Sequence, residues 1–206
     1  MPVILVANPK GGVGKSTISI NLAGYLAAQG HRTMLGDTDR QQSARQWLAL
    51  RPAGLPAIEG WEVEDDGRVR TPKGVSHAVL DSPAGLHGKR LANLLKIADK
   101  VIVPLQPSLF DILATRDFLA QLAEERGGKG RPTVGVVGMR VDARTRAAEQ
   151  LHRFVDGLNL PVLGYLRDTQ NYVQLAAHGL TLWDVAPGRV EKDLPQWQEL
   201  LAWVGA

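Results

Sequence analysis

The stretch NPKGGVGKST (residues 8–17) follows the apolar run VILVA (3–7) and carries two lysines five residues apart. A glycine-rich turn after a strand lets backbone N–H groups curl around an anion. A helix that starts directly afterwards points its positive end at the same place. The stretch therefore predicts a phosphate-binding loop between a first strand and a first helix, which begins near Ser16.

The end of this stretch fits the nucleotide-binding pattern G-x-x-x-x-G-K-[ST], with Pro9 in the place of the first glycine. In that pattern the lysine, here Lys15, reaches the β- and γ-phosphates, and the hydroxyl of Ser16 coordinates Mg²⁺. A glycine-rich turn with incidental lysines is the alternative interpretation. The strand–loop–helix context favours the phosphate loop, so ATP and Mg²⁺ are the expected cofactors.

Composition narrows the class of protein. The chain has 206 residues, 44% of them apolar and 22% charged, and we expect residues 1–206 to form a single globular domain. It contains no cysteine, which excludes disulfides, thiolate metal sites and iron–sulfur clusters. A cytoplasmic location fits this composition. The net charge of +3 permits an anionic partner without requiring one.

Short runs rich in β-branched residues alternate with helix-like stretches. The runs are nearly continuous in apolar residues, as in a parallel sheet buried on both faces. They occupy residues 3–7, 33–39, 77–83, 100–105, 133–139 and 162–166, and the helix-like stretches occupy 16–29, 42–50, 87–97, 111–126 and 143–157. This alternation predicts a doubly wound α/β fold, with a mostly parallel sheet and helices on both faces. Residues 61–70 alternate around an Asp-Gly pair and predict a surface hairpin.

PKGGVGKST resembles the deviant Walker A motif of the ParA/MinD family of P-loop ATPases, and the chain is most similar to small ParA-type partition ATPases without an N-terminal DNA-binding domain. The resemblance extends over nearly the whole chain, through DTDRQQSA (37–44), VLDSPAG (79–85), IVPLQPSLFD (102–111) and LRDTQNYVQLAAHGLTLWD (166–184). Arg40 departs from the family pattern, which usually has proline at that place.

The resemblance implies a role for the second lysine, Lys10. In the family the equivalent lysine reaches across a dimer interface to the partner's nucleotide, where a cation offsets charge on the transferring phosphoryl group. A surface lysine that contacts only its own loop is the alternative. By the same resemblance the nucleotide is held by Lys10, Gly11, Gly12, Val13, Gly14, Lys15, Ser16 and Thr17, and Arg140 follows a strand end where the family contacts the adenine base.

Three carboxylates follow predicted strands, at the edge where open α/β sheets bind ligands. By resemblance Asp81 holds Mg²⁺ through water. Asp39, 24 residues after Lys15, orients the attacking water and contacts the metal shell, and Asp37 supports it. The alternatives are a turn-forming role for Asp81, and a polar strand end or helix cap for Asp37 and Asp39.

Basic residues gather between positions 126 and 153. The stretch contains Arg126, Lys129, Arg131, Arg140, Arg144, Arg146 and Arg153, opposed by Asp142 and Glu149. Residues 146, 149, 150 and 153 share one face of a predicted helix. A solvated basic helix is one interpretation. The other, by resemblance to ParA-type relatives, is a non-specific DNA-binding patch that includes Arg144, Arg146 and Arg153.

These features together predict a ParA-like ATPase switch that positions plasmid, chromosome or other cargo. It would dimerise around ATP, bind DNA non-specifically, associate with the nucleoid in the ATP state, and hydrolyse ATP slowly until an adaptor or DNA-binding partner protein stimulates it.

The main alternative is a MinD-like, membrane-associated spatial regulator. The segment DLPQWQELLAWVGA (193–206) has apolar residues at helical spacing but no basic residue after Lys192. We therefore expect a helix packed on the domain and no membrane binding. A metabolic P-loop ligase with a small-molecule substrate is a third possibility, for which the sequence offers no substrate pocket.

Overall fold

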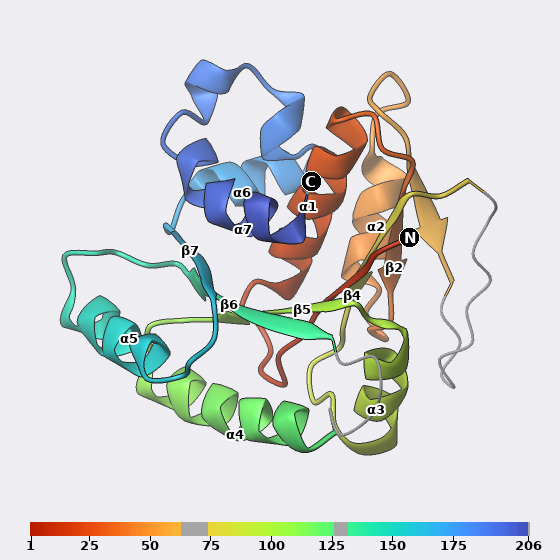
Figure 1. The fold of residues 1–206 in the computed structure, drawn as a ribbon. Coiled ribbons are helices and arrows are strands. Elements are labelled where there is room, and N and C mark those ends of the chain that lie inside the picture. The colour runs from red at the N-terminus through yellow and green to blue at the C-terminus, as the bar shows by residue number, and fades with distance from the viewer. Residues whose placement is uncertain (63–73, 126–131, 206) are drawn as a thin grey trace.

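The computed structural model describes residues 1–62, 74–125 and 132–205. Within those ranges the chain forms a seven-stranded, wholly parallel sheet in the order β3-β2-β4-β1-β5-β6-β7 (Figure 1). The strands are β1 (Val3–Val6), β2 (Thr33–Asp37), β3 (Ile58–Trp61), β4 (His77–Asp81), β5 (Lys100–Leu105), β6 (Thr133–Met139) and β7 (Val162–Leu166). The predicted doubly wound α/β class is confirmed, and the sheet is parallel throughout.

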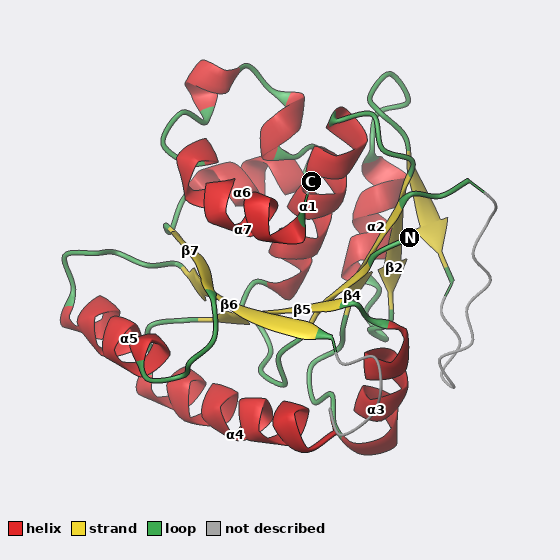
Figure 2. Cartoon of the chain, viewed as in Figure 1, coloured by secondary structure: helices red, strands yellow, loops and turns green. Residues whose placement is uncertain are grey.

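Helices cover both faces of this sheet (Figure 2). One face carries α1 (Lys15–Ala28), α2 (Ser43–Leu50), α6 (Gln170–Ala176) and α7 (Gln198–Val204), and the other carries α3 (Gly88–Ile97), α4 (Leu109–Glu125) and α5 (Arg146–Asp156). Three short 3-10 turns, η1 (Leu182–Asp184), η2 (Pro187–Arg189) and η3 (Leu194–Trp197), precede α7. The strands β4 and β1 are neighbours, but the chain continues from β1 towards β2 and from β4 towards β5, which lie on opposite sides of this pair. In doubly wound folds ligands bind at the carboxyl ends of strands where the connections diverge in this way.

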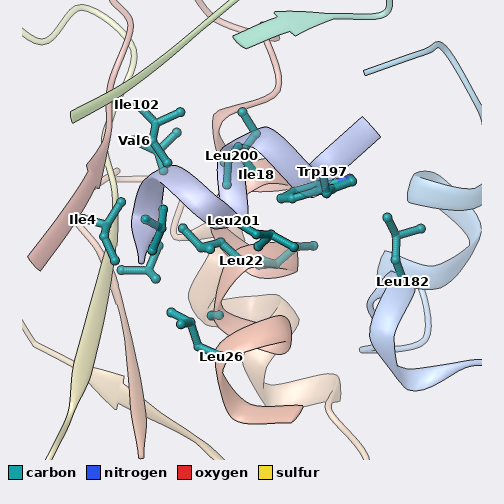
Figure 3. Packing of buried hydrophobic residues seen from close by; sticks show 14 of the residues in the cluster. Ile4, Val6, Ile18, Leu22, Leu26, Ile102, Leu182, Trp197, Leu200 and Leu201 are labelled. Atoms are coloured by element: carbon teal, nitrogen blue, oxygen red, sulfur yellow. The ribbon is translucent and has the colours of Figure 1, made fainter. Parts of the chain in front are cut away.

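Each face of the sheet has its own apolar core. On the α1 side, Ile18 and Leu22 pack with Ile4 of β1 and with Trp197 and Leu200 near the C-terminus (Figure 3). The core on the other face draws its buried residues from α3, α4 and α5. Strands that are buried from both sides must be apolar along their whole length, which explains the continuous apolar runs in the sequence.

The C-terminal segment packs as the apolar spacing indicated. Leu200, Leu201 and Val204 of α7 are buried. Lys100 Nζ donates to the backbone carbonyl oxygens of Trp203 (2.5 Å) and Val204 (3.0 Å). A cation therefore lies at the C-terminal end of this helix, where the helix dipole favours positive charge. Among the described residues, no helix has the length and apolar character needed to cross a membrane.

The structure contains α6 (Gln170–Ala176), which the sequence did not predict, and it differs from the sequence-based expectations at two further places. First, β3 is a parallel edge strand at 58–61 that was not expected, and the predicted hairpin at 61–70 falls mainly on residues 63–73, outside the described part of the chain. Second, α5 begins at Arg146 rather than at 143, because the Thr145 side chain accepts a hydrogen bond from Ala148 N (3.2 Å) and caps the helix. Arg144 therefore lies in the turn before the helix.

A buried ion pair joins α2 to the C-terminal region. The Arg51 guanidinium donates to both carboxylate oxygens of Asp184, at 2.9 and 3.0 Å, and the two side chains are only 5% and 1% exposed. Asp184 also accepts hydrogen bonds from the backbone and the hydroxyl of Thr181 (2.8 and 2.7 Å). Removing one partner of such a pair leaves a buried charge and typically costs about 3–5 kcal/mol.

Candidate functional site

A cavity of about 520 Å³ opens at the carboxyl ends of the strands. Its walls come from the loops that follow β1, β2, β4 and β6, which meet at this edge because the strands are parallel. The lining residues are Gly11, Gly12, Gly14, Lys15, Ser16, Thr17, Asp39, Gln41, Ser43, Ser82, Ala84 and Arg140. Segments far apart in the sequence thus form one polar hollow around the start of α1.

Two glycines shape the loop between β1 and α1. Gly12 and Gly14 have φ angles of +73° and +97°, which residues with side chains rarely adopt. A Cβ atom at position 14 would also lie 2.5 Å from Met139 Cε, at the end of β6. Gly14 is the N-cap of α1, so the first helical N–H groups open towards the cavity and offer an anion their partial positive charge.

The same loop is anchored from beneath by Asn8, which is fully buried. Asn8 Nδ2 donates to Pro104 O (2.7 Å) and to Thr115 Oγ1 (3.0 Å), and its Oδ1 accepts from Lys10 N (2.9 Å). Gln106 Nε2 donates to Gly12 O at 2.8 Å. The end of β5 and the side of α4 therefore hold the loop in a curled shape, so a ligand need not order it.

Lys15 is a desolvated cation at the floor of the cavity. Its side chain is largely buried, and Nζ donates to Lys10 O at 2.7 Å. Burial lowers the pKa of Lys15, while the carboxylates of Asp81 and Asp39 oppose that shift. An ammonium held in a polar hollow with loop N–H groups around it is suited to an anion such as a phosphate.

Behind Lys15 lies a pair of oxygen donors of the kind that Mg²⁺ prefers. Ser16 Oγ donates to Asp81 Oδ2 at 2.6 Å, and Ser19 Oγ lies 3.3 Å from Asp81 Oδ1. Asp81 is 1% exposed, and this burial, only partly countered by the Ser16 hydrogen bond, raises its pKa to about 7. A hydroxyl and one carboxylate, completed by phosphate oxygens and water, make a typical magnesium site.

A buried hydroxyl supports the same fit. Within the described residues Ser82 Oγ has no hydrogen-bond partner, although Ser82 is 1% exposed and lines the cavity. A buried polar group without a partner costs about 1–3 kcal/mol, and a phosphate oxygen or a bound water in the cavity could remove that cost. The residues present therefore fit a nucleotide phosphate with Mg²⁺.

Asp37 and Asp39 occupy different positions after β2. Both oxygens of Asp37 accept backbone N–H groups, Oδ1 from Asp39 (2.9 Å) and Oδ2 from Ala44 and Arg45 (2.8 and 3.2 Å). Asp37 therefore fixes the loop and caps the start of α2, without lining the cavity. Asp39 does line it, and its Oδ1 accepts from Gln41 N at 2.9 Å.

Comparison with known proteins assigns this chain to a family. The family model of the CobQ/CobB/MinD/ParA nucleotide-binding domain matches residues 4–182. The chain belongs to this family.

Two relatives and one solved structure are similar to this chain. It is 33% identical to the chromosome-partitioning ATPase Soj of Thermus thermophilus, over 72% of this chain and 73% of Soj. It is 29% identical to the maintenance of carboxysome distribution protein A of Gloeobacter kilaueensis, over 87% of this chain and 83% of that protein. A plasmid partition protein from Borrelia burgdorferi B31, solved with AMPPNP, has the same fold, with a TM-score of 0.76 at 15% identity over 98% and 99% of the two chains.

The cavity gathers most of the residues that the ParA/MinD resemblance selected. Four of them lie outside its wall: Lys10 is partly exposed beside it, Val13 is buried in the core, and Asp37 and Asp81 stand behind the lining residues. Four residues that line the cavity had no predicted role, namely Gln41, Ser43, Ser82 and Ala84. All four lie within the quoted motifs 37–44 and 79–85, so the motifs contained the signal without showing which side chains face inward.

The basic residues assigned to DNA lie in the turn between β6 and α5 (Arg144) and in α5 itself (Arg146 and Arg153). Arg140, which lines the cavity, has a φ of +53° and lies 4.0 Å from Asp168. Arg144 forms two 2.9 Å hydrogen bonds with Asp142, whose pKa is lowered to about 2 by that contact. Arg146 and Arg153 are exposed on α5. Arg126, Lys129 and Arg131 fall outside the described residues.

The raised pKa of Asp81 gives a prediction for the protein without nucleotide or metal. The folded-state pKa of about 7 lies above the ordinary value of 3.8, so the folded chain keeps a proton that the unfolded chain releases. The Asp81 contribution to the free energy of unfolding therefore falls as pH rises from about 4 to about 7. Asp81→Asn should remove that fall, and its Tm should exceed that of the wild type at pH 8 more than at pH 5.

This prediction is checked by thermal unfolding in EDTA at both pH values. Asp117→Asn is the matched control, since Asp117 is an exposed carboxylate on α4. If Asp81→Asn and the wild type show the same dependence of Tm on pH, burial of the Asp81 carboxylate does not have the stated effect.

Proposed function

We propose that this chain is an ATPase switch that dimerises around ATP, binds DNA non-specifically, and hydrolyses ATP to partition or position plasmid, chromosome or other cargo. The carrying observation is the cavity, which collects Lys15, Ser16 and Asp39 from two motifs but leaves Lys10 outside its wall. Partition ATPases and carboxysome-distribution proteins among the relatives support this class of function.

The residues of the cavity divide the chemical work. Backbone N–H groups of the glycine loop and Lys15 bind the phosphates. Ser16 and Asp81 would hold Mg²⁺, which would neutralise charge on the β- and γ-phosphates. Asp39, on the cavity wall beside Gln41, orients the attacking water, and Asp37 keeps the backbone of Asp39 in place. Arg140, which also lines the cavity, contacts the base.

The surroundings of Lys10 support a dimer. Its carbonyl oxygen and its N–H group are engaged by Lys15 and Asn8, which fixes its backbone, yet no carboxylate within the described residues pairs with its side chain. A cation that is partly exposed at the rim and outside its own cavity is available to a nucleotide in a second subunit. Such a dimer would contain two nucleotides, and each would be contacted by Lys10 of the other subunit.

The surface next to the loop also suits a second subunit. Gln106, which contacts Gly12 of the loop, is followed closely by the start of α4. There Leu109 is 60% exposed and Phe110 is 74% exposed. Leu113, one turn further along α4, adds a third exposed apolar side chain. Large apolar side chains in contact with water favour association, so covering them in a nucleotide-dependent dimer would stabilise it.

Two observations favour DNA over a membrane as the surface that the switch binds. Arg146 and Arg153 are exposed on one face of α5, and the Arg153 contact with Glu149 is long (3.8 Å) and exposed, so it competes weakly with phosphate. The apolar residues of α7, by contrast, are packed against the core and offer no apolar face to a bilayer.

DNA binding should therefore require ATP, be indifferent to sequence, and fall steeply with salt through counterion release. An ATP dimer presents two weak patches to one duplex, which raises avidity without new contacts. Replacing Arg146 and Arg153 with Ala should weaken binding and reduce the slope of log K against log salt by about one to two units.

The measurement is a salt titration of binding to random duplex DNA, with ATP and with ADP. Arg189→Ala with Lys192→Ala is the matched control, because it removes the same charge from exposed positions on the other face of the sheet. ATP-dependent sedimentation with anionic liposomes, without DNA binding, would instead support a membrane-associated regulator of the MinD kind.

A further inference from the structure

The loop that carries Asp39 is fixed at the residue before it, Thr38. Thr38 N and Thr38 Oγ1 both donate to Asp81 O, at 3.0 and 3.1 Å. On the opposite side, the Thr38 carbonyl oxygen accepts a short hydrogen bond from Arg90 Nη2. The peptide groups on both sides of Thr38 are therefore held, one by β4 and the other by an arginine from α3.

Arg90 occupies an unusual position for a cation. It lies with Lys89 in the first turn of α3, where acidic residues are absent and the helix dipole disfavours positive charge. The side chain is partly buried, and it reaches 52 residues back along the sequence to Thr38. A charge-assisted hydrogen bond to a carbonyl oxygen is stronger than a neutral one, and it offsets the unfavourable placement.

The contact bears directly on the cavity because Asp39 follows Thr38. Asp39 N donates to Asp37, and the Asp39 side chain lines the cavity. Residue 40 is an arginine, which, unlike a proline, places no restriction on the backbone of Asp39. The backbone of Asp39 therefore depends on hydrogen bonds, and the Arg90 contact restrains the peptide that enters it.

We propose that Arg90 is a positioning residue for ATP hydrolysis, which holds the Thr38 carbonyl and thereby fixes the backbone from which Asp39 reaches the attacking water. This inference rests on the proposed ATPase function. Arg90 touches neither nucleotide nor water in this role. Its effect should be seen in the rate of hydrolysis, in the order of the loop, and only slightly in ATP affinity.

The first test uses the nucleotide-free protein. In Arg90→Ala, amide hydrogen exchange in the peptide covering residues 38–42 should accelerate by about tenfold, the effect of losing one charge-assisted hydrogen bond. Arg90→Lys should lie between this variant and the wild type. Lys89→Ala, an exposed cation in the same turn, should exchange like the wild type.

The second test separates binding from chemistry. In Arg90→Ala, single-turnover hydrolysis should fall by about tenfold or more while the Kd for ATP stays within about twofold of the wild type. Unchanged hydrolysis and unchanged exchange in Arg90→Ala would overturn the positioning role alone. Equal loss of affinity and rate, with a lowered Tm, would show a merely structural role. A wild-type chain that binds no ATP would overturn this inference together with the proposed function.

Discussion

Lys10→Ala is expected to abolish ATP-dependent dimerisation and to lower turnover by about a thousandfold or more, the scale of a charge supplied in trans. ATP binding by the single chain should persist, because the Lys10 side chain is absent from the wall of its own cavity. The backbone contacts of residue 10 with Asn8 and Lys15 do not need its side chain, so the loop keeps its shape in the variant.

Light scattering with ATP and a steady-state ATPase assay check this expectation. Lys192→Ala, which removes an exposed lysine far from the loop, should behave as the wild type in both. Mixing Lys10→Ala with Asp39→Ala offers a sharper test. A mixed dimer places an intact Lys10 opposite the site that retains Asp39, so activity should partly return. A normal ATP dimer in Lys10→Ala with normal hydrolysis would exclude the role across the interface.

Asp39→Ala is expected to have the opposite effect on assembly. The variant keeps the glycine loop, Lys15 and the Ser16–Asp81 pair, so it should bind ATP and dimerise. Without the carboxylate that orients water, hydrolysis should slow by about a hundredfold, within the usual range for a positioned acid–base group. The dimer should then accumulate and decay slowly.

Size-exclusion chromatography after removal of free ATP measures the lifetime of that dimer. Asp37→Ala is the informative comparison, because Asp37 accepts three backbone hydrogen bonds and does not line the cavity. Loss of this cap should lower the free energy of unfolding by about 1 kcal/mol, and with it the Tm. It should also slow hydrolysis, because the loop that carries Asp39 would lose its order. Wild-type hydrolysis in Asp39→Ala would assign the water-orienting role to another residue.

Much of the fold was accessible from the sequence because local signals and the global architecture agree. The glycine loop requires strand, turn and helix in a fixed order, and buried parallel strands require continuous apolar runs. Strand β3 escaped detection for a physical reason. It has four residues, IEGW, with an exposed glycine and a partly exposed glutamate, and it pairs only at the edge of the sheet, so neither length nor periodicity marks it.

The candidate site was accessible only in part. Spacing places Lys15, Ser16 and Asp39 in motifs, but it cannot show that Asp37 turns both oxygens to backbone N–H groups while Asp39 lines the cavity. The contacts of Arg90 with Thr38 and of Arg51 with Asp184 join residues 52 and 133 positions apart. Such pairs depend on how helices pack against the sheet, which no local pattern encodes.

The Arg51–Asp184 pair has a mechanical consequence for α2. This helix is held at its start by the Asp37 carboxylate and just beyond its end by a buried ion pair. A helix held at both ends resists tilting when a ligand enters or leaves the cavity. Any movement must be absorbed in residues 38–42, where Gln42 already has a φ of +52°. Because β2 and α2 on either side of this loop are held, a change in the cavity should alter the backbone of the loop before it moves either element.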